Sequence, residues 1–186
     1  MKTKSVKKVS QSKTRPYDVA MAGHICFDII PAFFDSGSRA IEEIIAPGKL
    51  VQVGGAALST GGPVSNTGIG LKTFGMKVVF MAKVGDDDIG SLVIRRLKKH
   101  GHAEGVKIAA GEATSYTIAL APPGIDRIFL HHPGTNNSFT SADIDYLLVK
   151  KCRHFHMGYP PLMRALYSNG GSELVECFRK AKKAGA

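Results

Sequence analysis

Cysteine is scarce in this sequence, with three residues among 186. Cys26, Cys152 and Cys177 lie far apart, with no CxxC pair and no metal-ligand spacing to the histidines. This pattern argues against a disulfide framework or a zinc site, so we interpret all three as reduced thiols. No apolar run is long enough to span a membrane, and the N-terminus lacks the apolar stretch of a secretory signal. The cytoplasm is therefore the expected compartment.

Several motifs of well-known enzyme classes are also missing. There is no GxxxxGK[ST] phosphate loop, because Gly48-Lys49 is followed by Leu50, and no GxGxxG follows the first predicted strand. The sequence contains neither a GxSxG nucleophile elbow nor an HExxH zinc motif. These absences argue against Walker-type ATPases, dinucleotide-binding dehydrogenases, α/β-hydrolases and zinc proteases.

The net charge of +10 is concentrated at one end of the chain. Residues 1–15 contain six Lys and Arg and no acidic residue, which leaves +4 for the other 171 residues. Such a Lys/Ser/Thr-rich tail cannot bury enough apolar surface to offset the entropy of ordering, so residues 1–16 are predicted to be disordered. The tail has no aromatic side chain for base stacking, so nucleic acid is not the expected partner.

Apolar and amphipathic segments alternate through the remaining chain, residues 17–186. Strands are predicted at 17–23, 25–30, 77–84, 106–109 and 152–157, and helices at 61–75, 86–100, 141–151 and 171–184. The alternation predicts an α/β sandwich with a mostly parallel sheet. Two β-rich segments, 48–58 and 114–132, fall outside this pattern. The second contains a Pro-Pro-Gly-Ile-Asp turn at 122–126, so we expect both to form a small exposed sheet, a lid.

Polar groups follow the first strand and open the first helix. Asp28 stands just beyond the first strand, at the edge where open α/β sheets bind ligands, and its carboxylate can accept hydrogen bonds from two hydroxyl groups of a sugar. Gly61 and Gly62 precede Asn66 at a helix N-terminus, where the backbone can approach a ligand closely. The alternative interpretations are a turn-capping aspartate and a glycine-rich turn with a helix cap. The acids at 86–88 are interpreted as helix-dipole partners rather than metal ligands.

Four motifs, in this order, resemble the ribokinase-like (PfkB) family of carbohydrate kinases over residues 17–186. They are Gly23-x-Ile-x-x-Asp28, Gly61-Gly-Pro-Val-Ser-Asn66, Val84-Gly-Asp-Asp-Asp-Ile-Gly90 and His132-Pro-Gly-Thr-Asn136. The resemblance implies a three-layer sandwich with a β lid, and an ATP- and Mg²⁺-dependent kinase that phosphorylates a sugar or nucleoside hydroxyl. It also implies a homodimer formed through the lid.

The same resemblance implies the residues that bind the substrate. Asp28 and Asn66 would hydrogen-bond sugar hydroxyls, and Gly61 and Gly62 would line the same pocket. Four lid residues would cover the sugar: Thr117, Ala119, Arg127 and His131. No metal ligand is expected among these residues.

The sequence departs from the family pattern at several positions. Cys26 stands where ribokinases have asparagine, Pro63 replaces a lysine, and Gly158 replaces a glutamate, so ribose is not the expected substrate. The family's GAGD motif, whose aspartate is the general base, does not occur in the sequence. The last predicted helix is followed by no further strand, although a crossover in a parallel sheet requires one.

We therefore expect a fragment that carries the substrate-binding half, with the general base beyond Ala186. The alternative is a non-catalytic sugar-binding or interaction protein of the same fold.

The missing GAGD motif generates the first testable prediction. The purified 186-residue chain, incubated with ATP, Mg²⁺ and any sugar, should form no sugar phosphate above the protein-free background, because the groups that activate the hydroxyl and stabilise the transferring phosphoryl group are missing. A coupled ADP-release assay measures this, and Mg²⁺-dependent turnover would contradict the expectation.

Overall fold

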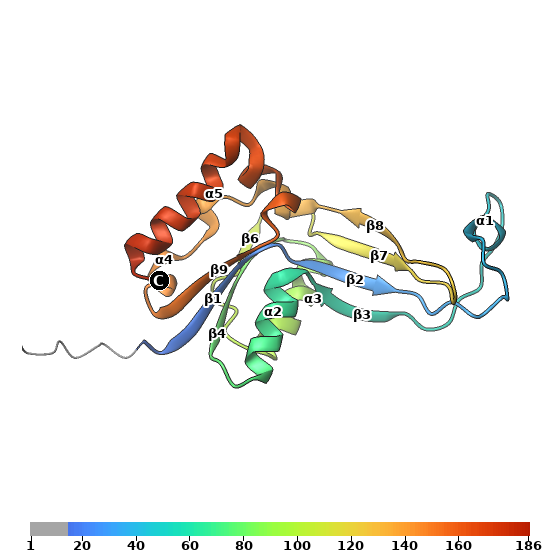
Figure 1. Ribbon diagram of the computed structural model, residues 1–186, viewed down its shortest axis with the longest axis horizontal. Helices are drawn as coiled ribbons and strands as arrows, with labels where there is room; N and C mark the ends of the chain where they lie inside the picture. Colours follow the sequence, from blue (N-terminus) through green and yellow to red (C-terminus); the bar gives the residue numbers. More distant parts are fainter. Residues whose placement is uncertain (1–14) are drawn as a thin grey trace, which may run out of the picture.

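Three parallel strands form the central sheet of the body. The computed structural model describes residues 15–186. The central strand β1 (Tyr17–Gly23) lies between β4 (Val78–Met81) and β9 (Cys152–Gly158), and both neighbours run parallel to it (Figure 1). A second parallel pair, β5 (Lys83–Gly85) and β6 (Lys107–Ala109), continues beside it.

Both faces of this sheet are buried under helices. Val19 and Met21 of β1 pack into a core with residues of α2 (Gly62–Thr73) and α3 (Asp88–Lys98). Ala20 and Ala22, which point to the opposite face, pack into a second core with α4 (Tyr146–Val149) and α5 (Arg164–Ala184). Because both faces of β1 and β4 are covered, these two strands are mostly apolar, as in parallel sheets generally, whereas the edge strand β9 exposes Arg153, His154 and His156. The arrangement confirms the predicted α/β sandwich (Figure 1).

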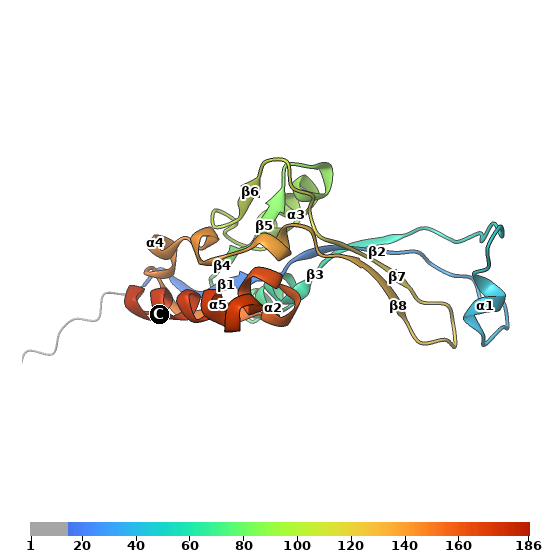
Figure 2. The ribbon, with the colours of Figure 1, turned by 90° about the horizontal axis from the view of Figure 1, so that it is seen from above.

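A four-stranded sheet projects from the body and forms the lid (Figures 1 and 2). Its strands are, in spatial order, β3 (Ala57–Gly61), β2 (Cys26–Ile30), β7 (Tyr116–Leu120) and β8 (Ile128–His132). β2 and β7 pair in parallel, and the two outer pairs are antiparallel. The short elements are α1 (Ile41–Ile44), η1 (Gly134–Ser138), η2 (Ser141–Asp143) and η3 (Pro160–Leu162).

The first predicted lid segment is displaced along the chain. Within residues 48–58 only the end is a strand, because β3 begins at Ala57, and Val53 forms a single bridge with Phe33. The glycine pair at 54–55 has no side chain to pack across a strand pair, which weakens pairing there. The lid also takes in residues 26–30, which adjoin the first body strand in sequence. The second predicted segment, 114–132, contains the hairpin of β7 and β8.

The predicted helix at 141–151 is wrong as a single element. Thr140 and Asp143 form a capping box around the short η2, and the Asp145 side chain then accepts from the amides of Leu147 and Leu148 to start α4. These side-chain hydrogen bonds to the backbone compete with a continuous helix. In α5, residues 168–171 are non-helical, so the regular helix begins close to the predicted residue 171.

The predicted disordered tail falls almost entirely outside the described residues. Arg15, the first described residue, donates a hydrogen bond of 2.6 Å to the carbonyl of Cys152. In the part of the chain from residue 15 onward, no helix combines the length and the apolarity that a bilayer crossing requires.

Asp87 connects the body to the start of the lid hairpin. As the N-cap of α3, its Oδ1 accepts from the Gly90 amide at 2.7 Å and from the Thr114 hydroxyl at 2.6 Å. Its Oδ2 accepts from the Thr114 amide at 2.7 Å, and the Thr114 hydroxyl in turn accepts from the Gly85 amide. Burial by itself would raise the pKa of Asp87, but these hydrogen bonds outweigh it and lower the pKa below its usual value.

The second prediction follows from this network. Asp87→Ala should lower the free energy of unfolding by about 2 kcal/mol, because a helix cap and charge-assisted hydrogen bonds are lost together. Since the native pKa is depressed, the stabilisation is present above the unfolded-state pKa of about 4 and is lost as the pH falls through the native value. The stability difference between the two proteins should therefore narrow below about pH 4.

Urea denaturation at several pH values measures this difference. Asp88→Ala is the matched control, because Asp88 lies in the same first turn of α3, is exposed and does not cap the helix, and it should cost only about 0.5 kcal/mol. An equal loss in the free energy of unfolding for Asp87→Ala and Asp88→Ala would contradict the role of Asp87 as the cap of α3.

Candidate functional site

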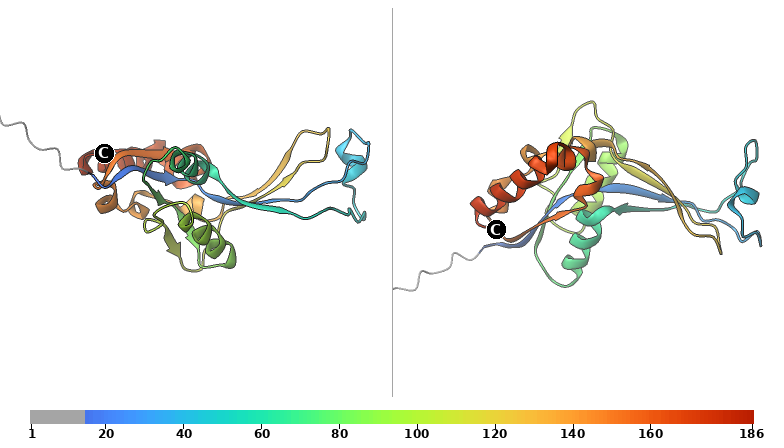
Figure 3. Two further views of the ribbon diagram at one scale, coloured as in Figure 1. Left: turned by 90° about the horizontal axis from the view of Figure 1, so that it is seen from below. Right: turned by 45° about the horizontal axis from the view of Figure 1, so that its top comes forward.

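A cavity of about 830 Å³ lies where the lid meets the carboxyl ends of the body strands. In Figure 3 this is the junction from which β2, β3, β7 and β8 extend. The cavity brings together seven of the eight predicted site residues: Asp28, Gly62, Asn66, Thr117, Ala119, Arg127 and His131. The eighth, Gly61, does not line it but lies directly against Asp28.

Asp28 is half-buried on β2, with Ser59 of β3 and Thr117 of β7 as its partners in register. The Cys26 thiol donates to Asp28 Oδ1 at 3.2 Å. Burial, followed by the charge of Asp28, raises the pKa of Cys26 to about 12, so the thiol stays protonated and serves as a donor. One carboxylate oxygen is therefore held in place while further lone pairs of the carboxylate remain for a ligand.

The two glycines before Asn66 are required by close packing. A Cβ atom added to Gly61 would overlap Asp28 Oδ2. Gly62 has φ +81°, and a Cβ atom there would lie 2.6 Å from His24 Nδ1. Asn66 itself is exposed in the first turns of α2 and lines the cavity from the body side. The two glycines therefore leave the space that the side chains of Asp28 and His24 occupy.

The lid residues close the opposite wall. Thr117 and His131 are register partners on β7 and β8, and Thr117 Oγ1 lies 2.9 Å from His131 Nδ1. Burial, and then the neighbouring His132, lower the pKa of His131. Ala119, buried two pairs further along the hairpin, contributes a small apolar wall. Arg127 is exposed, with its guanidinium 5.7 Å from the centre of the Phe129 ring.

The sequence prediction missed three aromatic residues of the cavity wall, His24, Phe129 and Tyr159. His24 precedes Cys26 and Asp28 at two-residue spacing, the pattern of side chains on one face of an extended chain, and this spacing could have identified it. Tyr159 follows β9 with φ 53° and ψ 47°, a left-handed conformation that is rare outside glycine. No pattern in the sequence indicates that conformation.

Two departures from the ribokinase pattern contact one another. A Cβ atom added to Gly158 would overlap the ring of Pro63. A side chain at position 158 therefore does not fit beside Pro63, and the ribokinase glutamate has no structural counterpart here.

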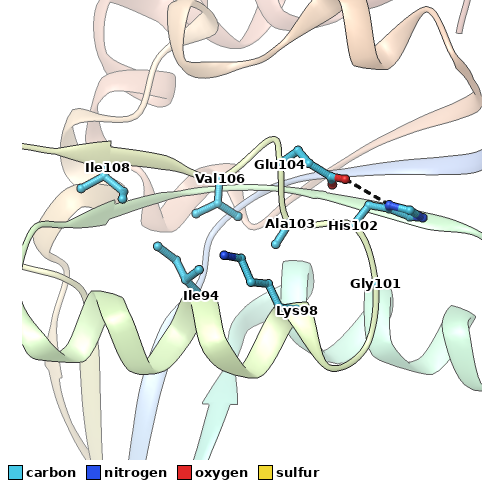
Figure 4. A pocket seen from close by; sticks show the side chains of 8 residues that line it. All are labelled: Ile94, Lys98, Gly101, His102, Ala103, Glu104, Val106 and Ile108. Atoms are coloured by element: carbon cyan, nitrogen blue, oxygen red, sulfur yellow. Dashed lines mark hydrogen bonds and ion pairs between the residues drawn. The ribbon is translucent and has the colours of Figure 1, made fainter.

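A second cavity, of about 410 Å³, lies between α3 and the segment 101–108 (Figure 4). Ile94 and Lys98 project from α3 toward that segment. Its single carboxylate, Glu104, faces His102 Nδ1 at 3.2 Å and is therefore already paired. None of the predicted site residues lines this second cavity.

The family model of the pfkB carbohydrate kinases matches residues 22–186. The chain belongs to the pfkB family. Fructokinase-2 of Solanum lycopersicum is 29% identical over 171 residues, which cover 88% of this chain and 46% of that protein. Fructokinase-2 of Oryza sativa subsp. japonica is 27% identical over 144 residues, covering 76% and 42%. The chain thus spans less than half the length of these two relatives.

Solved structures show the same fold. Ribokinase from Giardia lamblia matches with a TM-score of 0.70 at 17% identity, over 90% of this chain and 51% of that one. Adenosine kinase from Sinorhizobium meliloti matches with a TM-score of 0.65 at 20% identity, over 91% and 54%. The predicted ribokinase-like, three-layer fold with its lid is confirmed.

The third prediction tests the packing behind Asp28. Gly61→Ala should lower the free energy of unfolding by about 1–3 kcal/mol, because its methyl group must displace the Asp28 carboxylate. Gly70→Ala, in α2 with open space around it, should instead raise stability by about 0.5–1 kcal/mol, as alanine does within a helix. Thermal unfolding measures the stability of both variants. A Gly61→Ala variant that is as stable as the parent would contradict the close packing of Gly61 against Asp28.

Proposed function

We propose that this chain is the acceptor-binding half of an ATP-dependent kinase that transfers the γ-phosphate of ATP to a hydroxyl group of a sugar or nucleoside. The observation that supports this most is the convergence of the residues matching the family's substrate positions on one cavity around Asp28. The fructokinase names of the relatives make D-fructose the first substrate to test.

In this proposal the carboxylate of Asp28 accepts hydrogen bonds from two hydroxyl groups, and the Asn66 amide contacts a third. The Cys26 thiol holds one carboxylate oxygen in place, so the Asp28 carboxylate is oriented before the sugar binds. Thr117, Ala119 and His131 cover the sugar from the lid, which keeps water away from the reacting hydroxyl.

The nucleotide and the metal belong to the complete kinase rather than to these residues. Across residues 15–186, no group of three His, Cys, Asp or Glu side chains is arranged to hold a metal ion, and the sequence has no phosphate loop and no GAGD motif. We therefore assign no residue of this chain to ATP, to Mg²⁺ or to the general base. A ribokinase of Cryptococcus neoformans with this fold was solved in complex with ADP, which supports ATP as the donor for the complete protein.

The absence of GAGD also favours the second candidate, a non-catalytic sugar-binding or interaction protein of the same fold. Both candidates use the same cavity, and they differ in whether a complementary half completes the enzyme. Exposed apolar side chains on the lid outside the cavity lining, including Leu58, Ile128 and Leu130, support the prediction of a homodimer through this sheet. The cytoplasmic location also stays a prediction.

The fourth prediction addresses Asp28. In calorimetric titrations with D-fructose, Asp28→Ala should weaken binding by about tenfold or more, because each hydrogen bond to a charged group contributes about 1.5–3 kcal/mol. Asn66→Ala should cost less, since its amide is neutral and exposed. Thermal stability should change little in either variant, because neither side chain belongs to the two hydrophobic cores.

Asp126→Ala is the matched control, because Asp126 is an exposed carboxylate between β7 and β8 of the same sheet and outside the cavity lining. Unchanged affinity for Asp28→Ala would leave Asp28 without a role in binding and remove the main support for a sugar site.

A further inference from the structure

His24 is a buried polar side chain with nothing to bond to in the described structure. It is 3% exposed, and neither Nδ1 nor Nε2 has a hydrogen-bond partner among the residues from 15 onward. The ring lies in the cavity wall, and its aromatic neighbours are His131, with ring centres 5.5 Å apart, and Tyr159, at 6.1 Å. Buried polar side chains almost always have partners, so two unpaired nitrogens in one ring require an explanation.

The backbone fixes this ring at the junction of body and lid. The His24 amide donates to the Gly158 carbonyl at 3.2 Å, and the His24 carbonyl accepts from the Val64 amide at 3.3 Å. Gly62 packs against the Nδ1 side of the ring without a side chain of its own. His24 is therefore held between β1, α2 and β9, and it cannot move far to find a protein partner.

The ring is neutral in this position. Burial, and then the neighbouring His131, lower the pKa of His24 to about 4. A neutral imidazole presents one N–H donor and one acceptor nitrogen, and a hydroxyl group can pair with either of them. A phosphate or carboxylate would pair best with the charged imidazolium, which burial disfavours.

We infer that His24 binds a hydroxyl group of the sugar whose other hydroxyls contact Asp28, and that it selects an unphosphorylated polyol at this end of the cavity. The inference rests on the proposed function, because both residues line the same cavity. In this inference, the sugar hydroxyl pairs with one of the two unpaired ring nitrogens.

Replacing the ring should therefore affect stability and affinity in opposite directions. His24→Phe keeps the aromatic shape and removes both unpaired nitrogens, so the melting temperature of the free protein should rise by about 2 °C or more. The affinity for D-fructose in calorimetry should fall by about fivefold or more, which corresponds to one lost neutral hydrogen bond of about 1 kcal/mol. A residue that only packs would leave the sugar affinity unchanged.

A spectroscopic measurement and two further variants complete the test. In long-range ¹H–¹⁵N spectra, adding D-fructose should shift the resonance of a His24 ring nitrogen. The ring-nitrogen resonances of His154, which is exposed on β9 outside the cavity, should not change. His24→Leu covers the case in which phenylalanine does not fit, and it should show the same loss of affinity. His154→Phe is the control and should bind D-fructose like the parent. D-Fructose 6-phosphate should bind the parent chain more weakly than D-fructose.

The outcomes separate this inference from the proposed function. If D-fructose binds the parent and both His24 variants equally, or if its binding leaves the His24 ring nitrogens unchanged, the role of His24 is overturned and the sugar site stands. Tighter binding of D-fructose 6-phosphate would overturn the selection of an unphosphorylated sugar. If D-fructose, D-glucose, D-ribose and adenosine all fail to bind the parent chain, the proposed function itself is overturned, and the inference with it.

Discussion

Close packing around three glycines at the junction of body and lid determines where the carboxylate of Asp28 and the ring of His24 lie. Gly23 has φ +120°, and a side chain there would overlap the backbone of Gly158 at the end of β9. Gly62 packs in the same way against His24, and Gly61 against Asp28. Because these contacts leave no room for side chains, the chain passes from β1 into the lid within two residues. The carboxylate of Asp28 is thereby placed beside the N-terminus of α2.

The electrostatics of the cavity follow from that packing. Burial keeps the thiol of Cys26 and the imidazole of His24 neutral, so both can hydrogen-bond without adding charge. Asp28 is the one carboxylate among the residues that line the cavity, and Arg127 at its outer rim is exposed to solvent. A neutral ligand with several hydroxyl groups matches this arrangement better than a charged one, because an anion would meet Asp28 directly.

Much of this could be predicted from the sequence because the signals are local. Apolar runs mark β1 and β4, and glycine-rich motifs mark the turns where the chain packs closely. The boundaries of the first lid segment could not be predicted, since β3 is defined by pairing with β2, a strand remote in sequence. The break between η2 and α4 depends on two competing caps, and the unpaired ring of His24 depends on three segments meeting in space. Long-range packing of this kind leaves little trace in the local pattern.

The central claim is that this chain by itself forms a sugar-binding cavity between the body and the lid. Backbone amide spectra of the ¹⁵N-labelled 186-residue chain, recorded during a titration with D-fructose, test it most directly. The account predicts saturable shifts confined to residues around the cavity, such as Asp28, Asn66 and Thr117, and no shifts in the second cavity beneath α3. An absence of saturable shifts, or shifts centred on His102 and Glu104 instead, would contradict the account.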